Sequence, residues 1–255
     1  MGDAQNVAES APFPRFALNV VGRDFAVGDI HGSFSHLSLS LEAIGFDASV
    51  DRLFSVGDLV DRGPESDQVL AWLAKPWFHA ICGNHDFMAY QSALGLAQST
   101  SYLQVWGEWL AGLSNARQRL IGEALAALPL AMEIETAWGV VGLVHADCPF
   151  DDWREMQALP WASVEPTDAL GDCCLWSMER YSRRYAEPVR NVRAVVHGHM
   201  VIKAPEVLGN VYFIDTGGWK PGGCFTFLEL EALKPQLGPR APGADPGEFA
   251  NRRNR

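Results

Sequence analysis

The stretch FAVGDIHGSF, which runs from Phe25 to Phe34, places a carboxylate and an imidazole between glycines immediately after a short apolar run. A run such as Phe25-Ala26-Val27 is typical of a buried strand. Asp29 and His31 stand two positions apart, so both side chains project in the same direction as the strand runs out. The flanking glycines allow a tight turn without adding a side chain beside this pair. The stretch therefore predicts a strand that delivers two polar groups to one place.

A helix and two further strands are predicted downstream. Ser33 and Gly45 are favourable residues for the start and the stop of a helix whose apolar side chains recur on one face. The stretch RLFSVGD (residues 52–58) reads as a second buried strand, residues 66–74 as a second helix, and FHAICGN (78–84) as a third strand. This β-α-β-α-β order predicts a parallel core sheet with right-handed crossovers.

The second half of the chain changes character. Residues 117–128 have the pattern of an amphipathic helix that ends at Pro129. Residues 128–147 then alternate like a hairpin, with its turn near Ala137-Trp138-Gly139. Three later strands are expected in VRAVVHGH, NVYFIDTGG and CFTFLELE. We therefore predict an α/β fold in which two mixed β-sheets pack face to face and are flanked by helices.

The amino-acid composition limits which partners and which cellular location are expected. The 255 residues carry a formal net charge of −11, and the pI is near 5.0. Binding to nucleic acid or to an anionic membrane surface needs a basic patch, so neither partner is expected. No apolar run approaches the roughly 20 residues of a membrane span, and the odd number of cysteines has no disulfide spacing. We expect a cytoplasmic protein, and the sequence leaves its oligomeric state open.

Both ends of the chain are expected to be disordered tails. Residues 1–14 begin with small and polar residues, and residues 234–255 are rich in proline, glycine and charge. The folded domain is therefore predicted over residues 15–233.

Polar groups follow four further strand ends in the same way as they follow the first. These stretches are GDLVDRG (57–63), GNHD (83–86), VHAD (144–147) and HGH (197–199). In parallel sheets ligands gather beyond the carboxyl ends of the strands, so five such ends describe one site. Carboxylate and amide oxygens mixed with imidazoles suit Mn²⁺, Fe or Zn²⁺, and they exceed what one four-coordinate ion needs. Two ions about 3.5–4 Å apart, with one carboxylate between them, fit better.

These motifs, in this order and spacing, resemble the calcineurin-like metallophosphoesterases, and among them the bacterial and phage branch of serine/threonine protein phosphatases. The resemblance covers about residues 25–230 and includes LPLAMEIE, HADCPFDDW and YFIDTGG. It implies the four-layer α/β/β/α sandwich of that family, with residues 15–233 as the catalytic domain. It also implies two divalent metal ions, with Mn²⁺ as the favoured ion and Fe or Zn²⁺ as alternatives.

The resemblance assigns the metal ligands position by position. Six positions match: Asp29, His31, Asp58, Asn84, His145 and His199. Asp58 would bridge the two ions, one of which is completed by Asp29 and His31 and the other by the remaining three residues. A hydroxide between the ions would be the nucleophile. His197 is interpreted as a neighbour of the site and not as a ligand.

The same motifs carry the implied catalytic residues. If the backbone is extended at Asn84, the next residue, His85, diverges from it toward the substrate, where it would protonate the leaving oxygen. Asp61 would hold the His85 imidazole in one tautomer. Arg62 would grip the phosphate with its planar fork. Asp86 is expected to form a structural ion pair.

One stretch departs from the family pattern. The branch usually carries W-x-R-x-R, in which the first arginine reaches the phosphate, whereas LWSMER here puts Met178 at that position. Arg180, the second basic residue of the stretch, is assigned a substitute role in substrate binding. Trp106 and Trp109 lie in the least regular segment, and core packing is favoured for them over a place on a substrate rim.

The leading functional hypothesis is a two-metal phosphomonoesterase, of the serine/threonine protein phosphatase kind, that acts on a phosphorylated protein or a small phosphoester. The alternative is symmetrical hydrolysis of dinucleoside tetraphosphates such as Ap4A, because relatives with that activity also resemble GDIHG and GNHD. A second alternative is a non-catalytic binding scaffold of the same fold, which predicts eroded ligands, and none is eroded. Asp61 in VDRG and the stretch HADCPFDDW favour the phosphatase.

Overall fold

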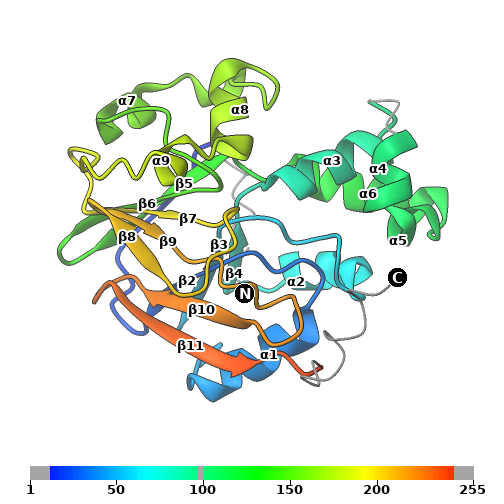
Figure 1. Cartoon of the computed structure of the whole chain (residues 1–255), viewed down its shortest axis with the longest axis horizontal. Helices are drawn as coiled ribbons and strands as arrows, with labels where there is room; N and C mark the ends of the chain where they lie inside the picture. Colours follow the sequence, from blue (N-terminus) through cyan, green and yellow to red (C-terminus); the bar gives the residue numbers. More distant parts are fainter. Residues whose placement is uncertain (1–11, 97–99, 244–255) are drawn as a thin grey trace, which may run out of the picture.

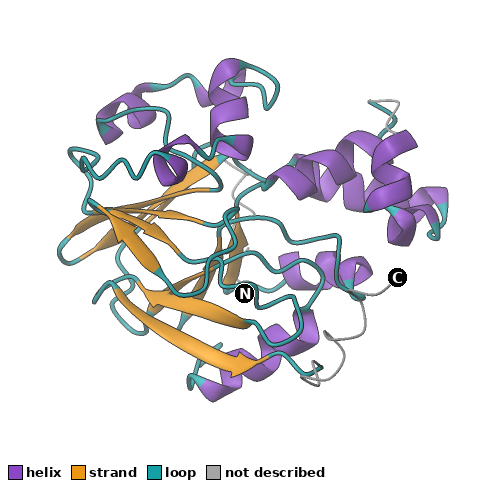
Figure 2. Ribbon diagram, viewed as in Figure 1, coloured by secondary structure: helices purple, strands orange, loops and turns teal. Residues whose placement is uncertain are grey.

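The computed structural model describes residues 12–96 and 100–243, and it shows two β-sheets packed face to face with helices outside them (Figure 1, Figure 2). The predicted α/β fold with two mixed sheets is confirmed. The strands are β1 (Arg15–Phe16), β2 (Asp24–Val27), β3 (Arg52–Ser55), β4 (Phe78–Ala80), β5 (Ala131–Thr136), β6 (Gly139–Val144), β7 (Ala194–His197), β8 (Glu206–Leu208), β9 (Val211–Phe213), β10 (Cys224–Glu229) and β11 (Lys234–Arg240).

The first sheet has five strands in the order β11-β10-β2-β3-β4. Strands β2, β3 and β4 are parallel neighbours in chain order, as the alternation of strands and helices predicts. Strand β10 pairs antiparallel with both β2 and β11. The sheet is therefore parallel where the glycine-rich motifs leave it and antiparallel at the opposite edge.

The second sheet has six strands in the order β1-β5-β6-β7-β9-β8. The predicted hairpin is present as β5 and β6, which pair from Ala131 with Val144 to Thr136 with Gly139. Strands β6, β7 and β9 are parallel neighbours, and β8 adds antiparallel to β9. Strand β6 therefore ends beside β7, with both running in the same direction.

Both faces of the central strands are buried, as in β2 and β7. Ala26 belongs to the apolar cluster between the two sheets, whereas its neighbours Phe25 and Val27 belong to the cluster under the helices. This is the alternation of side chains that a strand imposes. Burying a large apolar side chain contributes roughly 1.5–3 kcal/mol. The two clusters therefore hold the sheets firmly enough to fix the loops at their ends.

Helices form the outer layers and one further group. They are α1 (Phe34–Ala43), η1 (Ser66–Gln68), α2 (Val69–Leu73), α3 (Asn84–Ala93), α4 (Thr100–Val105), α5 (Glu108–Ala111), α6 (Asn115–Ala126), α7 (Trp153–Ala158), η2 (Trp161–Ser163), α8 (Ala169–Trp176) and α9 (Glu179–Ser182). In Figure 1, α1 lies against the five-stranded sheet, α7 to α9 lie over the six-stranded sheet, and α3 to α6 form a group of their own at the right. Within the described ranges, none of the helices combines the length and apolar character needed to cross a bilayer.

The structure corrects the predicted domain ends. Residues 234–240 form β11, which pairs with β10, so this part of the expected tail is ordered. At the other end Phe13 is buried, and its ring stacks on that of Trp161 at 5.1 Å. The rest of both expected tails, residues 1–11 and 244–255, lies outside the described residues. The folded domain therefore extends beyond residues 15–233 in both directions.

The contact between β6 and α7 gives a test of the packing. A Cβ atom added at Gly142 would lie 2.2 Å from Cη2 of Trp153, which is fully buried. We expect Gly142→Ala to lower the free energy of unfolding by about 1–3 kcal/mol, because the indole cannot move without strain. Gly112→Ala is the matched control, since its Cβ would meet its nearest neighbour at an ordinary 3.5 Å. Urea denaturation measures both, and equal effects would contradict the proposed packing.

Candidate metal centre

The six residues predicted as metal ligands lie together at the ends of five strands. Strands β2, β3 and β4 of one sheet lead to Asp29 with His31, to Asp58 and to Asn84. Strands β6 and β7 of the other sheet lead directly to His145 and, two residues beyond the strand, to His199. The site therefore lies where the two sheets meet, and both sheets contribute to it.

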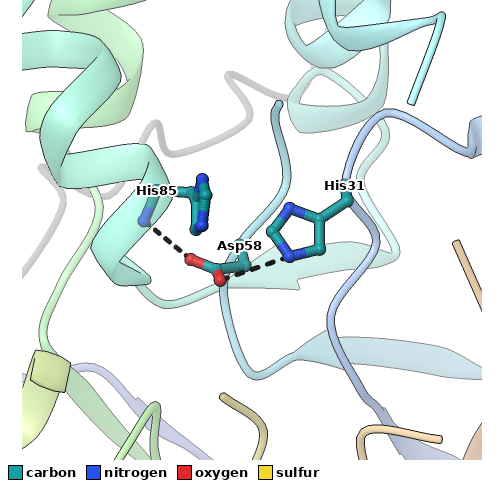
Figure 3. Close-up of side chains that lie close together, drawn as sticks. All are labelled: His31, Asp58 and His85. Carbon is teal, nitrogen blue, oxygen red and sulfur yellow. Dashed lines mark hydrogen bonds and ion pairs between the residues drawn. The ribbon is translucent and has the colours of Figure 1, made fainter. Parts of the chain in front are cut away.

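Asp58 is at the centre of this group. Its Oδ2 lies 3.5 Å from Nε2 of His31, as Figure 3 shows, and its Oδ1 lies 3.6 Å from Nε2 of His145. Oδ2 of Asp29 lies 3.9 Å from the same nitrogen of His31. Asp29, His31, Asp58 and His145 are each at most 2% exposed. Asp58 is thus the carboxylate that faces a histidine on each side.

Asn84 joins the two histidines of the second sheet. Its Oδ1 lies 2.9 Å from Nε2 of His145 and 3.0 Å from Nδ1 of His199. The backbone N–H of His199 donates to Oδ1 of Asp29 at 3.0 Å, which ties the end of β7 to the end of β2. The two sheets are therefore connected through the site itself.

The imidazoles are prepared to act as neutral ligands. Nδ1 of His31 lies 2.9 Å from the Val60 carbonyl, and Nδ1 of His145 lies 2.7 Å from the Val56 carbonyl. Donation to a carbonyl places the proton on Nδ1 and leaves the lone pair of Nε2 facing Asp58. Burial lowers the pKa of His31 to about 3, and it also lowers the pKa of His145. Such nitrogens are suited to coordinate a cation.

The buried carboxylates of the site also favour binding of a cation. Burial, followed by the charges of Asp215 and Asp58, holds the pKa of Asp29 well above its usual range. Asp215, which follows β9, is 1% exposed, and its Oδ2 has no hydrogen-bond partner among the described residues. Buried carboxylates are stable when they are paired or coordinate a metal. A buried group of oxygens and lone-pair nitrogens without enough donors therefore fits divalent cations.

The backbone is strained at this site. Five of its residues, none of them glycine, have φ values between 45° and 72°: His31, Asp58, Asp61, Arg62 and His199. This left-handed region costs of order 1–3 kcal/mol for most residues. The surrounding structure must hold these residues there, and the strain fixes where their side chains point.

His85 occupies a different position from the six residues. It is in the first turn of α3, so the prediction of an extended backbone at Asn84 is wrong. The backbone N–H of His85 donates to Oδ1 of Asp58 at 2.8 Å (Figure 3). In its ring, Nδ1 donates to Oδ2 of Asp61 at 2.7 Å, and Nε2 accepts from Nη2 of Arg62 at 3.1 Å. Both ring nitrogens of His85 thus have hydrogen-bond partners in the protein.

Arg62 lies between two tryptophans at the mouth of the site. Its guanidinium carbon is 4.7 Å from the ring centroid of Trp106 and 4.6 Å from that of Trp219. Trp106 is 37% exposed, and its ring also meets that of His85 edge-on at 5.3 Å. The prediction that Trp106 packs in the core is wrong. Such stacking holds a cation in place while its N–H groups stay available.

Trp109 also belongs to the site. Its Nε1 donates to Oδ1 of Asp61 at 2.7 Å, and the hydroxyl of Tyr102 donates to the same oxygen at 2.8 Å. The sequence gives no motif for these contacts, because the donors come from the irregular segment around α4 and α5. Trp109 also packs against the main apolar cluster, so the prediction of core packing is confirmed for this residue, and its indole N–H binds Asp61 in addition.

Arg180 does not have the freedom that its predicted role requires. It is 4% exposed, and its Nη1 donates to the carbonyls of Tyr185 and Glu187 at 3.2 and 2.9 Å. Its other nitrogens lie 3.5 Å from the carboxylates of Asp147 and Asp151. The guanidinium is thus committed to its own surroundings, and we correct its assignment to substrate binding.

The prediction of an ion pair at Asp86 is also wrong. Its carboxylate accepts from the backbone N–H groups of Leu59 and Gly83 at 2.9 and 3.0 Å. These bonds join the loop after β3 to the start of α3. Asp86 therefore holds the loop that carries Asp58 against the start of the helix that carries Asn84.

Comparisons with known proteins agree with this arrangement. Residues 25–203 match the family model described as calcineurin-like phosphoesterase. The chain is 34% identical over 211 residues to serine/threonine-protein phosphatase 1 of Salmonella typhimurium, covering 81% of this chain and 91% of that protein. It is 47% identical over 158 residues to a symmetrical bis(5'-nucleosyl)-tetraphosphatase of Pseudomonas putida, covering 58% of this chain and 49% of that protein.

A solved structure shows the same fold. It is a protein serine/threonine phosphatase from Saccharomyces cerevisiae, with a TM-score of 0.64 and 16% sequence identity, covering 92% of this chain and 85% of that chain. At that identity the likeness concerns the fold alone.

Asp58 gives the sharpest test of metal binding. We expect Asp58→Asn to weaken binding of Mn²⁺ by at least about 100-fold, more than the 10- to 100-fold usual for groups that only support a ligand. The reason is that Asp58 faces histidines on both sides. Asp67→Asn, an exposed carboxylate in η1, is the control and should bind as the unaltered protein does. Calorimetric titration measures both, and two ions bound normally by Asp58→Asn would contradict its central position.

Proposed function

The chain belongs to the calcineurin-like phosphoesterase family, and from this premise we propose that it is a two-metal phosphomonoesterase that dephosphorylates serine and threonine residues of proteins. The observation that carries the proposal is the position of His85. Its backbone N–H contacts Asp58 at the centre of the ligand cluster, while its ring contacts Asp61 and Arg62. A phosphate bound at the cluster would thus have an acid and a cation beside it.

The proposed metal ligands are the six residues at the strand ends. Asp29 and His31 would hold one ion, Asn84, His145 and His199 the other, and Asp58 both. Two divalent ions supply a water of lowered pKa as nucleophile and polarise the phosphate oxygens. Mn²⁺ is the ion we propose, and Fe or Zn²⁺ would suit the same donors.

The remaining residues would bind the phosphate and handle the proton. Arg62 is exposed and stacked, so its fork can take two phosphate oxygens. In doing so Arg62 would release Nε2 of His85, which accepts from it in this structure. With its Nδ1 proton held by Asp61, His85 can exchange a proton only at Nε2. The freed Nε2, once protonated, would give that proton to the leaving oxygen.

The relatives support a protein phosphatase more than a dinucleotide hydrolase. The likeness to the Salmonella phosphatase extends over 91% of that protein, whereas the likeness to the Pseudomonas tetraphosphatase extends over 49%. The higher identity of the second relative nevertheless supports symmetrical hydrolysis of dinucleoside tetraphosphates as a second candidate. A non-catalytic scaffold is not favoured, because all six ligand positions carry donor side chains that lie together.

Activity of the metal-stripped protein tests the proposal. We expect Mn²⁺ to restore hydrolysis, with a higher kcat/KM on a phosphoserine peptide than on diadenosine tetraphosphate. A preference for the dinucleotide would favour the second candidate. If the protein binds metal but hydrolyses neither of these nor p-nitrophenyl phosphate, the proposed function is wrong.

The role of His85 predicts a dependence on the leaving group. We expect His85→Asn to lower kcat on a phosphoserine peptide by roughly 10²–10⁴-fold, as for other general acids. The loss on p-nitrophenyl phosphate should be much smaller, because a nitrophenolate departs without protonation. Metal content, measured by elemental analysis, should not change. An equal loss on both substrates, or release of metal, would identify His85 as a ligand or a structural residue.

A further inference from the structure

The carboxylate of Asp61 accepts hydrogen bonds from two groups in addition to its histidine partner. Oδ2 accepts from Nδ1 of His85 at 2.7 Å, and Oδ1 accepts from both the Tyr102 hydroxyl at 2.8 Å and Nε1 of Trp109 at 2.7 Å. Asp61 is completely buried, and its backbone N–H donates to Oγ of Ser66 at 2.9 Å. Each carboxylate oxygen therefore has its own set of donors.

We propose that Tyr102 and Trp109 are positioning residues for the reaction, which act by fixing the Asp61 carboxylate and through it the ring of His85. This inference rests on the proposed function, in which His85 protonates the leaving oxygen. With two donors on Oδ1, only Oδ2 remains to face the imidazole. The plane of the carboxylate, and hence the direction of Nε2 of His85, is set by groups that never touch the substrate.

Both donors keep their protons under working conditions. Burial, followed by the charge of Asp61, raises the pKa of Tyr102, so its hydroxyl stays protonated and donates. The indole N–H of Trp109 can only donate. Both groups therefore donate to Oδ1 of Asp61. Charge-assisted bonds of this kind are about twice as strong as neutral ones.

The local structure of the segment around α4 and α5 allows this contact. Tyr102 is in α4 and Trp109 in α5, helices of six and four residues, which are too short to be stable by themselves. A Cβ atom at Gly107, between them, would lie 2.5 Å from Cε1 of Tyr102. The N–H of Gly107 also donates to the Tyr102 carbonyl at 2.9 Å. Only a residue without a side chain allows the Tyr102 ring to lie this close to the turn.

The strain at Asp61 explains why such support is needed. Asp61 and Arg62 are consecutive residues with φ values of 72° and 65°. Residues other than glycine rarely adopt this backbone conformation. A backbone held under strain relaxes unless neighbouring contacts oppose it. The two bonds to Oδ1 and the bond to Ser66 tie Asp61 to the helices on one side and to its own loop on the other.

The test uses substitutions that remove the donors and little else. We expect Tyr102→Phe and Trp109→Phe each to lower kcat on a phosphoserine peptide by about 10-fold, the effect of one lost bond to a charged group. The loss on p-nitrophenyl phosphate should be much smaller, and KM and Mn²⁺ content should not change. Tyr90→Phe is the matched control, because it removes a buried hydroxyl from α3 in the same helical group. Its kcat should equal that of the unaltered protein on both substrates.

The outcomes separate this inference from the proposed function. If the unaltered protein hydrolyses the peptide and His85→Asn shows the leaving-group effect, but Tyr102→Phe and Trp109→Phe behave like Tyr90→Phe, the positioning role alone is wrong. Equal losses on both substrates, or losses that follow a fall in melting temperature, would also overturn it. Inactivity of the unaltered protein with Mn²⁺ would overturn the proposed function and this inference together. If Trp109→Phe fails to fold, Tyr102→Phe decides, because it removes a single oxygen atom.

Discussion

The site depends on one buried carboxylate, that of Asp58, around which the loops of both sheets are arranged. Its backbone carbonyl accepts from the N–H groups of Ile30 and His31, and its side chain accepts from the N–H of His85. A Cβ atom at Gly83 would lie 2.2 Å from Oδ1 of Asp58, so the start of α3 can approach only through a glycine. The ends of β2, β3 and β4 are therefore fixed relative to a single residue. His145, which follows β6, connects the six-stranded sheet to this group, because its Nδ1 lies 2.7 Å from the Val56 carbonyl after β3.

The acidic residues of the site divide into two kinds. Asp61 and Asp86 are buried carboxylates whose oxygens all accept from protein donors. The charge of Asp215 instead raises the pKa of Asp29, and Oδ2 of Asp215 has no hydrogen-bond partner in the part of the chain that the structure describes. Asp61 and Asp86 therefore need no cation to satisfy their oxygens. The second kind needs a proton or a cation, and with Asp58 it marks the side of the site where divalent ions would be held.

What the sequence could predict follows from how local each feature is. The six strand-end residues are predictable because each lies within a few positions of an apolar run and a glycine, as Asp29 does. The donors to Asp61 come from 41 and 48 positions away, in short helices without a regular pattern. The position of Arg180 is not predictable from its motif, because it pairs with two carboxylates that lie 33 and 29 positions earlier in the chain. The sequence does not predict strand β11, because its proline and glycine residues indicate disorder, and pairing with β10 overrides that preference.

The start of α3 directs Asn84 and His85 toward different groups of residues. Asn84 and His85 are consecutive residues in the first turn of α3, and consecutive side chains on a helix point about 100° apart. Asn84 therefore faces His145 and His199, whereas His85 faces Asp61 and Arg62. An extended backbone would have turned these side chains to opposite sides, farther apart than they are in the helix. The helix keeps Asn84 and His85 next to each other, and the helical group that follows it supplies the donors that hold Asp61.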